Sequence, residues 1–361
     1  KLIILKNLKS MDIAIIGGGF YGCYLAKHLS KNNNVYLYEK NSKLIQESGR
    51  NNQYRLHLGF HYPRSLETIN QTIEGYNYFK KEFKKFIYFP KKNYYLIHKK
   101  SLISFSKYCQ IFKKKKIFFK KINLKQIPHL KSLDQYSGAI ETSEGVILID
   151  KLIKDLTKTI KKKVNIFLKT EIKKIEAQNG LLYFKKNNYK KFDYIINTTY
   201  LNPNLGLTKR KFDSKYEGTA MLIPKTKISD LPGITIMDGN FVSLYPRSKD
   251  RFSISSVKFT PVYKFNSYKN IEKIKNLLQN KKNQNKIKKN IFNHFSKFIN
   301  LKFDLRKSKL ETSFKIKLKK DSNSLRTTNL IIEKKLISVF CGKLDTVPLI
   351  LNKLKKKLII N

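Results

Sequence analysis

The chain has 361 residues and a formal net charge of +51, in which 68 lysines outnumber 8 arginines. This length allows one large or two medium domains with a buried core, and no apolar run approaches the roughly 18 to 20 residues of a membrane-spanning helix. The lysines are spread along the whole chain instead of forming one basic face with exposed aromatics, so we expect no specific nucleic-acid partner.

Three cysteines stand far apart in the sequence, at Cys23, Cys109 and Cys341. Their odd number and wide spacing match neither a disulfide framework nor a metal site. We therefore expect no bound metal and a reducing, cytoplasmic compartment. Met11 stands directly before the first predicted strand, and we expect the protein to start close to it.

Residues 13–40 carry the pattern of a dinucleotide-binding unit. The apolar run 13–16 predicts a parallel strand that is buried on both faces, a helix follows as far as Leu29, and 35–38 predicts the next strand. Where the first strand gives way to the helix, three glycines follow the spacing G-x-G-x-x-G: Gly17, Gly19 and Gly22. This spacing permits a tight turn, a close approach of the backbone to a pyrophosphate, and close packing of the helix on the strand.

Glu39 follows Gly17 by 22 residues, at the end of the second predicted strand. An acid at this point accepts hydrogen bonds from an adenosine ribose. We expect the phosphates at the N-terminus of the helix, where N–H groups and the helix dipole favour anions. The order of strand, glycines, helix, strand and acid thus predicts a bound dinucleotide.

Residues 48–64, SGRNNQYRLHLGFHYPR, are dense in polar side chains. They include three of the eight arginines and two of the six histidines, namely Arg50, Arg55, Arg64, His57 and His61. In a lysine-rich chain, arginine indicates a need for planar, bidentate recognition of a carboxylate or a phosphate. The plainer interpretation is a polar surface loop with a turn at its proline.

Further along the chain, the predicted elements indicate a second domain that is interleaved with the first. In order they are aromatic-rich mixed pieces over 86–140, a helix over 150–162, three strands over 164–199, antiparallel strands over 216–263, a long helix or helix pair over 268–300, and a hairpin over 329–341. We expect a cofactor domain built from three separated segments and a substrate domain inserted twice. The expected cofactor segments are 11–85, 141–205 and 328–361, and the expected substrate segments are 86–140 and 206–327.

The glycine unit with Glu39, followed by SGRN at 48–51 and RLHLGFHY at 55–62, resembles the D-amino-acid oxidase superfamily of FAD-dependent oxidoreductases. A bacterial subgroup is more similar still, through its pattern N-x-x-R-x-H-x-G-x-H-Y-P-R-S, which 52–65 matches, and through a pattern that MDGNFVSLYP at 237–246 fits. The resemblance implies an α/β fold, with a Rossmann-like FAD-binding domain and an inserted α+β substrate domain that contains a mixed or antiparallel sheet. It also implies FAD, in preference to NAD, as the cofactor.

The resemblance assigns residues in several segments to the cofactor. Near the adenosine and pyrophosphate they are Gly17, Gly19, Phe20, Tyr21, Gly22, Glu39 and Lys40. Near the pyrophosphate or flavin they are Ser48, Arg50, Asn51, His57 and Gly59. Towards the carboxyl end they are Thr198, Thr199, Gly342, Lys343 and Thr346.

Two of these stretches depart from the family pattern. INTTY at 196–200 stands where relatives usually end a strand in Ala-x-Gly, and FCGKLDTVP at 340–348 lacks the second glycine of their G-x-x-G. A helix that begins near Asp345 or Thr346 would still direct its positive end towards a reduced flavin. Lys343 could add a positive charge there.

The resemblance further implies that FAD takes a hydride from a carbon bearing an amine or a hydroxyl, in a small amino-acid-like or hydroxy-acid substrate. The candidate catalytic residues are His57, His61, Tyr62, Arg64 and Arg247. Each of these two arginines follows an aromatic residue and a proline that fix its exit direction, which suits a clamp on a carboxylate. The histidines are candidate proton acceptors, because imidazole titrates near neutral pH, and a structural role for them is equally compatible with the sequence.

Two other functions fit parts of the sequence. UDP-galactopyranose mutase also begins with a glycine-rich FAD unit and isomerises its substrate, although its extra glycines after the second strand are missing here. The other alternative is a basic binding protein, for example of nucleic acid, with a vestigial cofactor fold. The expected partner is a small-molecule substrate, and the sequence does not specify the electron acceptor.

Overall fold

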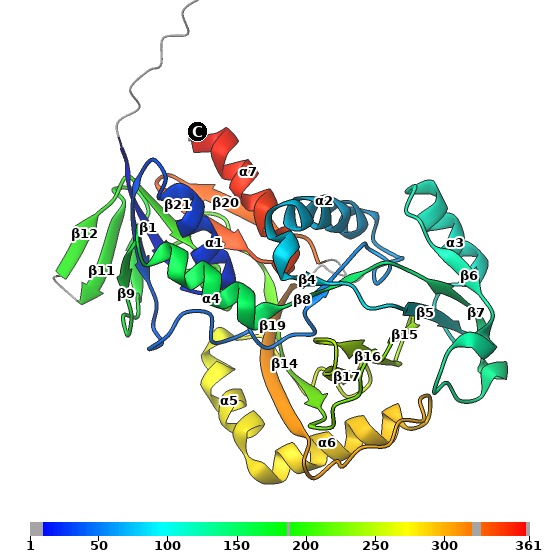
Figure 1. Ribbon diagram of the computed structural model, residues 1–361. Helices are drawn as coiled ribbons and strands as arrows, with labels where there is room; N and C mark the ends of the chain where they lie inside the picture. Colours follow the sequence, from blue (N-terminus) through cyan, green and yellow to red (C-terminus); the bar gives the residue numbers. More distant parts are fainter. Residues whose placement is uncertain (1–9, 186–187, 320–325, 359–361) are drawn as a thin grey trace, which may run out of the picture. The chain divides into compact units, whose positions relative to one another are not determined.

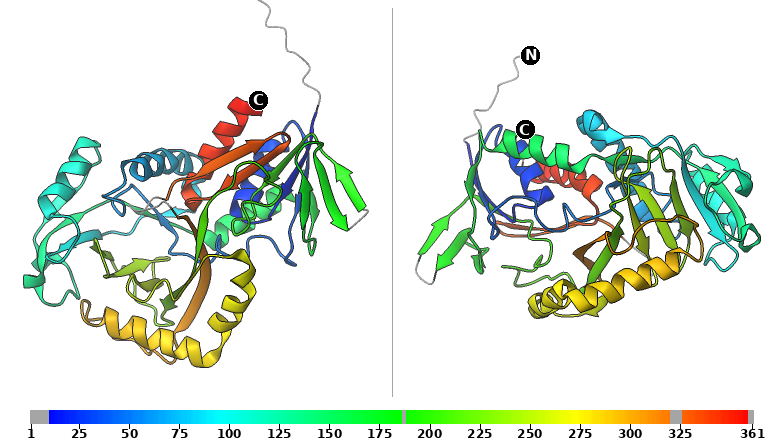
Figure 2. Two further views of the ribbon diagram at one scale, coloured as in Figure 1. Left: turned by 180° about the vertical axis from the view of Figure 1, so that it is seen from behind. Right: turned by 60° about the horizontal axis from the view of Figure 1, so that its bottom comes forward.

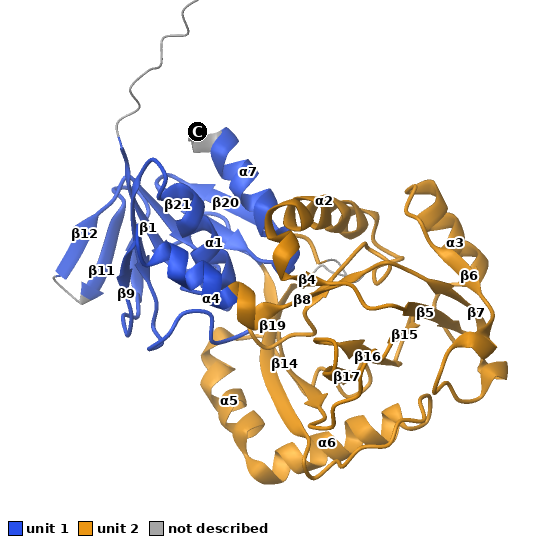
Figure 3. Cartoon of the chain, viewed as in Figure 1, with its two compact units in different colours: residues 1–49, 153–212, 328–361 blue, residues 50–152, 213–327 orange. Residues whose placement is uncertain are grey.

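The computed structural model describes residues 10–185, 188–319 and 326–358, which form two compact units (Figure 3). Unit 1 consists of residues 1–49, 153–212 and 328–361, and unit 2 of residues 50–152 and 213–327. Each unit is assembled from segments that are distant in the sequence, and each has its own main sheet. Within the described ranges, no helix is both long and apolar enough to cross a membrane.

A six-stranded sheet forms the centre of unit 1 (Figure 1). Its order is β20-β21-β13-β1-β2-β9, and all neighbours are parallel except the β20–β21 hairpin. The strands are β1 (Asp12–Ile16), β2 (Asn34–Tyr38), β9 (Asn165–Phe167), β13 (Tyr194–Asn197), β20 (Asn329–Glu333) and β21 (Leu336–Phe340). Residues 13–16 of β1 are all buried, as expected for a parallel strand in the middle of a covered sheet.

The helices of unit 1 follow directly from this sheet. Helix α1 (Phe20–Leu29) begins shortly after β1, and α7 (Val347–Leu358), preceded by a 3-10 turn (Leu344–Thr346), packs beside α1 (Figure 2). Helix α4 (Ile149–Ile160) begins in unit 2 and ends in unit 1. A separate antiparallel sheet contains β10 (Lys174–Glu176), β11 (Leu181–Lys185) and β12 (Asn188–Lys191).

Unit 2 is built on a nine-stranded mixed sheet. Its order is β18-β14-β17-β16-β15-β5-β7-β6, with β19 also paired to β14, and only the β15–β5 pair is parallel among these described strands. The strands are β5 (Asn93–His98), β6 (Lys120–Ile122), β7 (Tyr136–Glu141), β14 (Ser214–Ile223), β15 (Gly233–Met237), β16 (Val242–Pro246), β17 (Phe252–Ser256), β18 (Tyr263–Phe265) and β19 (Lys309–Leu318). Three strands of this sheet carry Tyr95, Thr235 and Ser243, which are described with the site below.

A second, small sheet and four helices complete unit 2. The small sheet joins β3 (Arg55–Leu56), β8 (Gly145–Ile147) and β4 (Ile87–Tyr88), with β8 in the middle. The helices are α2 (Leu66–Phe83), α3 (Phe105–Lys114), α5 (Ile271–Gln279) and α6 (Lys281–Phe295). Short 3-10 turns lie at Lys84–Phe86, Leu124–Gln126, Leu133–Gln135 and Tyr268–Asn270.

The core of unit 2 anchors the loop that follows β3. Phe60 in this loop is fully buried against Phe112, with ring centroids 4.6 Å apart, and in the same cluster as Ile69 and Tyr95. The Tyr108 hydroxyl donates to Phe60 O at 2.8 Å. The backbone around Phe60 is therefore held by apolar packing and by a buried hydrogen bond.

Several sequence-based expectations are confirmed. The helix expected over 150–162 is α4, the hairpin over 329–341 is β20–β21, and the region 268–300 forms a helix pair, α5 and α6. The expectation of three strands over 164–199 was wrong, because this region contains five short strands, β9 to β13. The chain turns at Lys169 and Gly180, which have φ values of 54° and 73°, and these turns divide the strands further than the apolar pattern indicated.

The expected segment boundaries differ from the observed units over 50–85 and 141–152, which belong to unit 2, and over 206–212, which belongs to unit 1. The physical reason is strand pairing: Arg55 on β3 is in register with Val146 on β8, and β8 pairs in turn with β4. Helix α2 was not predicted as an element, although Ser65 caps its first turn by accepting the Thr68 N–H. The assignment of the units as cofactor domain and substrate domain stays a prediction.

Packing between β1 and α1 gives a direct test of the fold. A Cβ at Gly22 would lie 1.9 Å from Gly17 O and 2.9 Å from Thr198 Oγ1. Gly22→Ala should therefore lower the free energy of unfolding by about 1 to 3 kcal/mol, as overpacking does. Chemical denaturation measures this, with Gly19→Ala as the control, since a Cβ at Gly19 meets no atom within 4 Å. Equal losses in the two variants would contradict the packing described here.

Candidate active site

Three glycines shape the loop between β1 and α1 in unit 1. Gly17 has a φ of 100°, a conformation that favours glycine, and its N–H donates to Tyr38 O at 2.8 Å. Gly22 is required because the chain packs closely on itself there, whereas Gly19 faces open space where α1 begins. The glycine spacing predicts a pyrophosphate on this open side of Gly19.

The start of α1 and the carboxylate of Glu39 complete this part of the site. Helix α1 has no side-chain cap at Gly19 and no acidic residue in its first turn, so neither offsets the positive end of its dipole. Glu39 is buried; its Oε2 accepts the Gly18 N–H at 2.7 Å and its Oε1 accepts the Asn41 N–H at 2.8 Å. A carboxylate oxygen has a second lone pair, which can accept a hydrogen bond from a ribose hydroxyl. The residues present therefore fit the pyrophosphate and adenosine of a dinucleotide.

The phenol of Tyr21 ties α1 to the last segment of unit 1. Its oxygen lies 3.1 Å from Thr328 Oγ1 and 3.0 Å from Thr346 Oγ1, and it donates to Lys343 O at 2.5 Å. Burial raises the pKa of Tyr21 well above its usual value, which keeps the phenol protonated. The Lys343 ammonium lies 3.5 Å from the Asp345 carboxylate, so its charge is balanced within the protein.

The two threonines after β13 contact the protein backbone and an asparagine. Thr198 Oγ1 lies 2.9 Å from both Ile16 O and Gly17 O, so this side chain supports the glycine loop. The Thr199 hydroxyl donates to Asn197 Oδ1 at 2.8 Å. Their contact with a cofactor stays a prediction, as it does for Phe20, Ser48 and Gly342.

Unit 2 brings together the two sequence patterns that resemble the bacterial subgroup. From the first pattern, Arg64 forms an ion pair with Asp238 of the second, in which Nη2 lies 3.4 Å from Oδ1. Arg55 of the first pattern donates through Nη2 to Ser243 Oγ of the second at 2.9 Å. Two stretches that are far apart in the sequence thus form one polar assembly.

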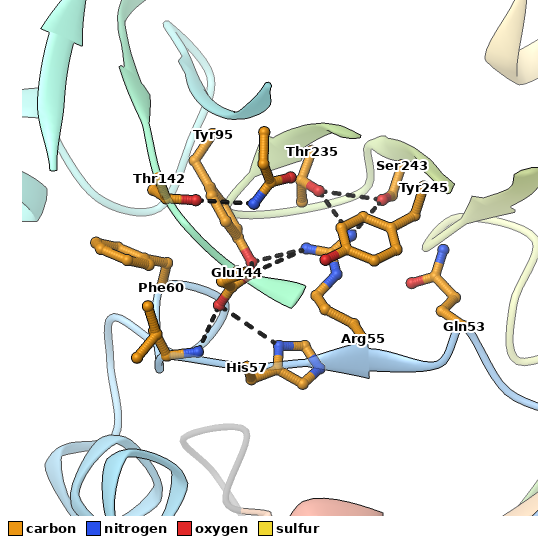
Figure 4. A network of polar contacts seen from close by, with 12 residues as sticks. Gln53, Arg55, His57, Phe60, Tyr95, Thr142, Glu144, Thr235, Ser243 and Tyr245 are labelled. Carbon is orange, nitrogen blue, oxygen red and sulfur yellow. Dashed lines mark hydrogen bonds and ion pairs between the residues drawn. The ribbon is translucent and has the colours of Figure 1, made fainter. Parts of the chain in front are cut away.

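A buried network of polar side chains surrounds Arg55 (Figure 4). Its Nη1 donates to the Tyr95 hydroxyl at 2.7 Å, and its Nη2 also donates to Thr235 Oγ1 at 2.8 Å. The Tyr95 hydroxyl donates in turn to Glu144 Oε2 at 2.6 Å, and burial raises the pKa of Tyr95 well above its usual value, so it keeps this proton. The side chains of Arg55 and Glu144 are 1% and 0% exposed, and their opposite charges compensate each other.

Two histidines and a tyrosine lie beside this network. The ring centroid of His57 lies 5.6 Å from that of His61 and 5.6 Å from that of Tyr62. The ring centroids of His61 and Tyr62 are 5.3 Å apart. His57 Nδ1 lies 3.9 Å from Glu144 Oε1, and the His57 side chain is 15% exposed. Three of the expected catalytic residues are therefore grouped next to a buried carboxylate.

The two expected substrate clamps have carboxylate partners of their own. Arg247 Nη1 lies 2.9 Å from Glu311 Oε2, and its guanidinium lies 4.0 Å from the centre of the Tyr54 ring. The Arg247 side chain is 9% exposed, whereas that of Arg64 is 31% exposed. Arg64 is therefore the more accessible of the two.

The other expected cofactor residues have mixed surroundings, and Gly59 among them is buried. Arg50 pairs with Asp150 at 3.0 Å, and both side chains are largely exposed. Asn51 Nδ2 donates to Thr312 O at 3.3 Å, Gly59 has a φ of 96°, and Lys40 is exposed. Across the described residues, no group of three His, Cys, Asp or Glu side chains could hold a metal ion.

The sequence did not predict a role for Glu144 or Tyr95. It predicted that the segment 237–246 matters, but assigned no role to Asp238 within it. One signal was available for the acids: the chain has 25 Asp and Glu against 76 Lys and Arg. In such a chain, an acid next to an apolar segment is a candidate for a buried ion pair. Glu144 stands directly before the apolar strand β8.

Comparison with known proteins extends this picture. The family model described as DAO, FAD dependent oxidoreductase, matches residues 12–287. FAD-dependent monooxygenase FPY4 of Fusarium mangiferae is 28% identical over 260 residues, which cover 70% of this chain and 66% of that protein, so the match spans just under two thirds of the relative. L-alpha-glycerophosphate oxidase from Mycoplasma pneumoniae has a TM-score of 0.73 at 17% identity, over 98% of this chain and 96% of its own. Glycine oxidase from Geobacillus kaustophilus has a TM-score of 0.69 at 12% identity, over 94% and 92% of the two chains.

These likenesses confirm the expected fold class, a Rossmann-like FAD-binding domain combined with a substrate domain, and they confirm FAD as the cofactor of the family. Because the family model covers well over half of the sequence, the chain belongs to the DAO family of FAD-dependent oxidoreductases.

Proposed function

We propose that the protein oxidises a small amino-acid-like or hydroxy-acid substrate, by removing a hydride from a carbon that bears an amine or a hydroxyl. The observation that carries this proposal is the open side of Gly19 at the start of α1, in a chain of an FAD-dependent family. Two proteins of the same fold are named as oxidases of α-glycerophosphate and of glycine, which supports the substrate class.

The residues of unit 1 would hold the cofactor. The phosphates would lie at Gly19, where the α1 dipole favours an anion, and the adenosine ribose would donate to Glu39. FAD, when bound, supplies the acceptor for the hydride. In unit 2, His57 or His61 would take up the proton that leaves the substrate amine or hydroxyl.

Arg64 or Arg247 would hold a substrate carboxylate, with the Tyr62 hydroxyl as an orienting group. Arg64 suits this role better, because about a third of its side chain is exposed. Its partner Asp238 fixes one side of the guanidinium, and a guanidinium has five N–H donors in a planar fork. The Arg247 guanidinium is instead enclosed by Glu311 and Tyr54.

The purified protein should contain non-covalently bound FAD, and Gly19→Val should remove most of it. A branched side chain at Gly19 would occupy the space of the phosphates, yet it meets no atom of the protein within 4 Å of its Cβ. The ratio of flavin absorbance to protein measures occupancy, and thermal melting verifies that the variant folds. Glu39→Gln should have a smaller effect, because the amide oxygen still accepts one hydrogen bond. Wild-type flavin occupancy in Gly19→Val would show that the phosphates do not lie there.

Anaerobic mixing with a panel of small amines, amino acids and hydroxy acids tests the reaction itself. At least one member of the panel should bleach the flavin absorbance, because net oxidation of the substrate reduces the cofactor. A mutase of the UDP-galactopyranose type would isomerise its sugar substrate without such bleaching. An FAD-containing protein that no member of the panel reduces would count against the proposed substrate class.

Arg64→Lys should weaken substrate-driven flavin reduction by about 1.5 to 3 kcal/mol, the contribution of one charged hydrogen bond. Lysine keeps the charge but lacks the planar fork that can hold Asp238 and a substrate carboxylate together. Stopped-flow reduction measures the loss, and flavin content should be unchanged. Arg306→Lys is the matched control, since the Arg306 side chain is 95% exposed in its pair with Asp304. Reduction kinetics of Arg64→Lys that equal those of the control would remove Arg64 as the clamp.

A further inference from the structure

The carboxylate of Glu144 faces two different groups, one with each oxygen. Oε2 accepts the Tyr95 hydroxyl at 2.6 Å and faces Arg55 at 3.8 Å. Oε1 accepts the Leu58 N–H at 2.7 Å and lies 3.9 Å from His57 Nδ1. Figure 4 shows Glu144 between the guanidinium of Arg55 and the imidazole of His57.

This position is not the one expected for a carboxylate that only neutralises Arg55. A buried arginine and carboxylate usually form direct, often bidentate, hydrogen bonds shorter than about 3 Å. Here the Tyr95 hydroxyl stands between them, because it accepts from Arg55 and donates to Glu144. The Leu58 N–H holds the other oxygen on the side of the histidine.

The side chains of Arg55, Glu144 and His57 differ in how much of each is exposed to solvent. The Arg55 and Glu144 side chains are 1% and 0% exposed, whereas His57 is 15% exposed. The imidazole is therefore the most exposed of these three groups, and the buried carboxylate lies on its Nδ1 side.

We propose that Glu144 is the positioning residue of His57. Through its negative charge, 3.9 Å from Nδ1, it favours the neutral tautomer that carries its hydrogen on Nδ1, so that the Nε2 lone pair accepts the proton from the substrate amine or hydroxyl. The proposal rests on the proposed function, in which His57 is the proton acceptor. One proton moves to Nε2, and the positive charge that then forms on the ring lies beside the Glu144 carboxylate.

The inference is tested by ¹⁵N NMR of the histidine side chains in the FAD-loaded protein, without substrate. The His57 signals are assigned by their loss in His57→Gln. At a pH where the ring is neutral, the wild type should show the Nδ1–H tautomer. In Glu144→Gln, which replaces the carboxylate by an amide of the same size, the Nε2–H tautomer should gain population.

Tyr95→Phe is the matched control. It breaks the same buried network and should also lower the melting temperature, but it leaves the Glu144 carboxylate and its Leu58 contact in place. Its His57 tautomer should therefore remain that of the wild type. Equal changes of the His57 tautomer in Glu144→Gln and Tyr95→Phe would show that Glu144 has only a structural role. A wild-type His57 in the Nε2–H tautomer would also contradict the proposal.

The pH profile of flavin reduction gives a second readout that structure alone would not move. Without the carboxylate, the acid limb should move to lower pH, because a nearby negative charge favours the protonated imidazole. Among the described residues, His61 and Tyr62 of its own loop lie 5.6 Å from His57 between ring centroids, and Arg55 on β3 and Tyr95 on β5 contact Glu144. The tautomer measurement needs no substrate, so an enzyme that fails to oxidise the panel would still report on Glu144.

Discussion

A guanidinium does not lose its proton in a protein, so a buried arginine needs acceptors for its donors and an opposite charge nearby. Arg55 imposes this requirement on unit 2. Its Nη1 and Nη2 donate to side chains from β5, β15 and β16, and its charge is balanced by the carboxylate directly before β8. Removal of any one partner would leave a buried polar group without a hydrogen bond. The free-energy penalty for such a group is larger than the net stabilisation that the hydrogen bond contributes. The small sheet of β3, β8 and β4 is thereby fixed against the large sheet.

The conformation of the loop after β3 is fixed by contacts with this network and with the apolar core. Glu144 accepts the Leu58 N–H, and two residues later the Phe60 ring enters the apolar core, where the Tyr108 hydroxyl donates to its carbonyl oxygen. His57 is thus held between a buried ion pair on one side and a packed ring on the other. Side chains are positioned more precisely on a segment that is fixed by packing and hydrogen bonds than on a loop without such contacts.

Unit 1 depends on a different constraint: three of its positions need glycine, or leave open space, because glycine has no side chain. Gly22 allows α1 to approach the Gly17 carbonyl, Gly17 adopts a φ of 100°, and Gly19 leaves the start of the helix open. The Tyr21 hydroxyl then joins α1 to the segment before α7 through buried hydrogen bonds. Two of the expected cofactor residues at the carboxyl end, Lys343 and Thr346, therefore make contacts inside the protein.

The sequence by itself determined the elements whose causes are local. The G-x-G-x-x-G spacing with Glu39 predicted β1, α1 and β2, because tight turns and close helix packing require glycine at fixed offsets whatever the rest of the chain does. Periodicity likewise predicted α4 and the β20–β21 hairpin. Only the tertiary structure decided that residues 50–85 join unit 2, that Arg64 meets Asp238, and that Glu144 stands behind His57. These pairings link residues up to 174 positions apart, and which buried charge faces which is decided by strand register and core packing, not by neighbours in the sequence.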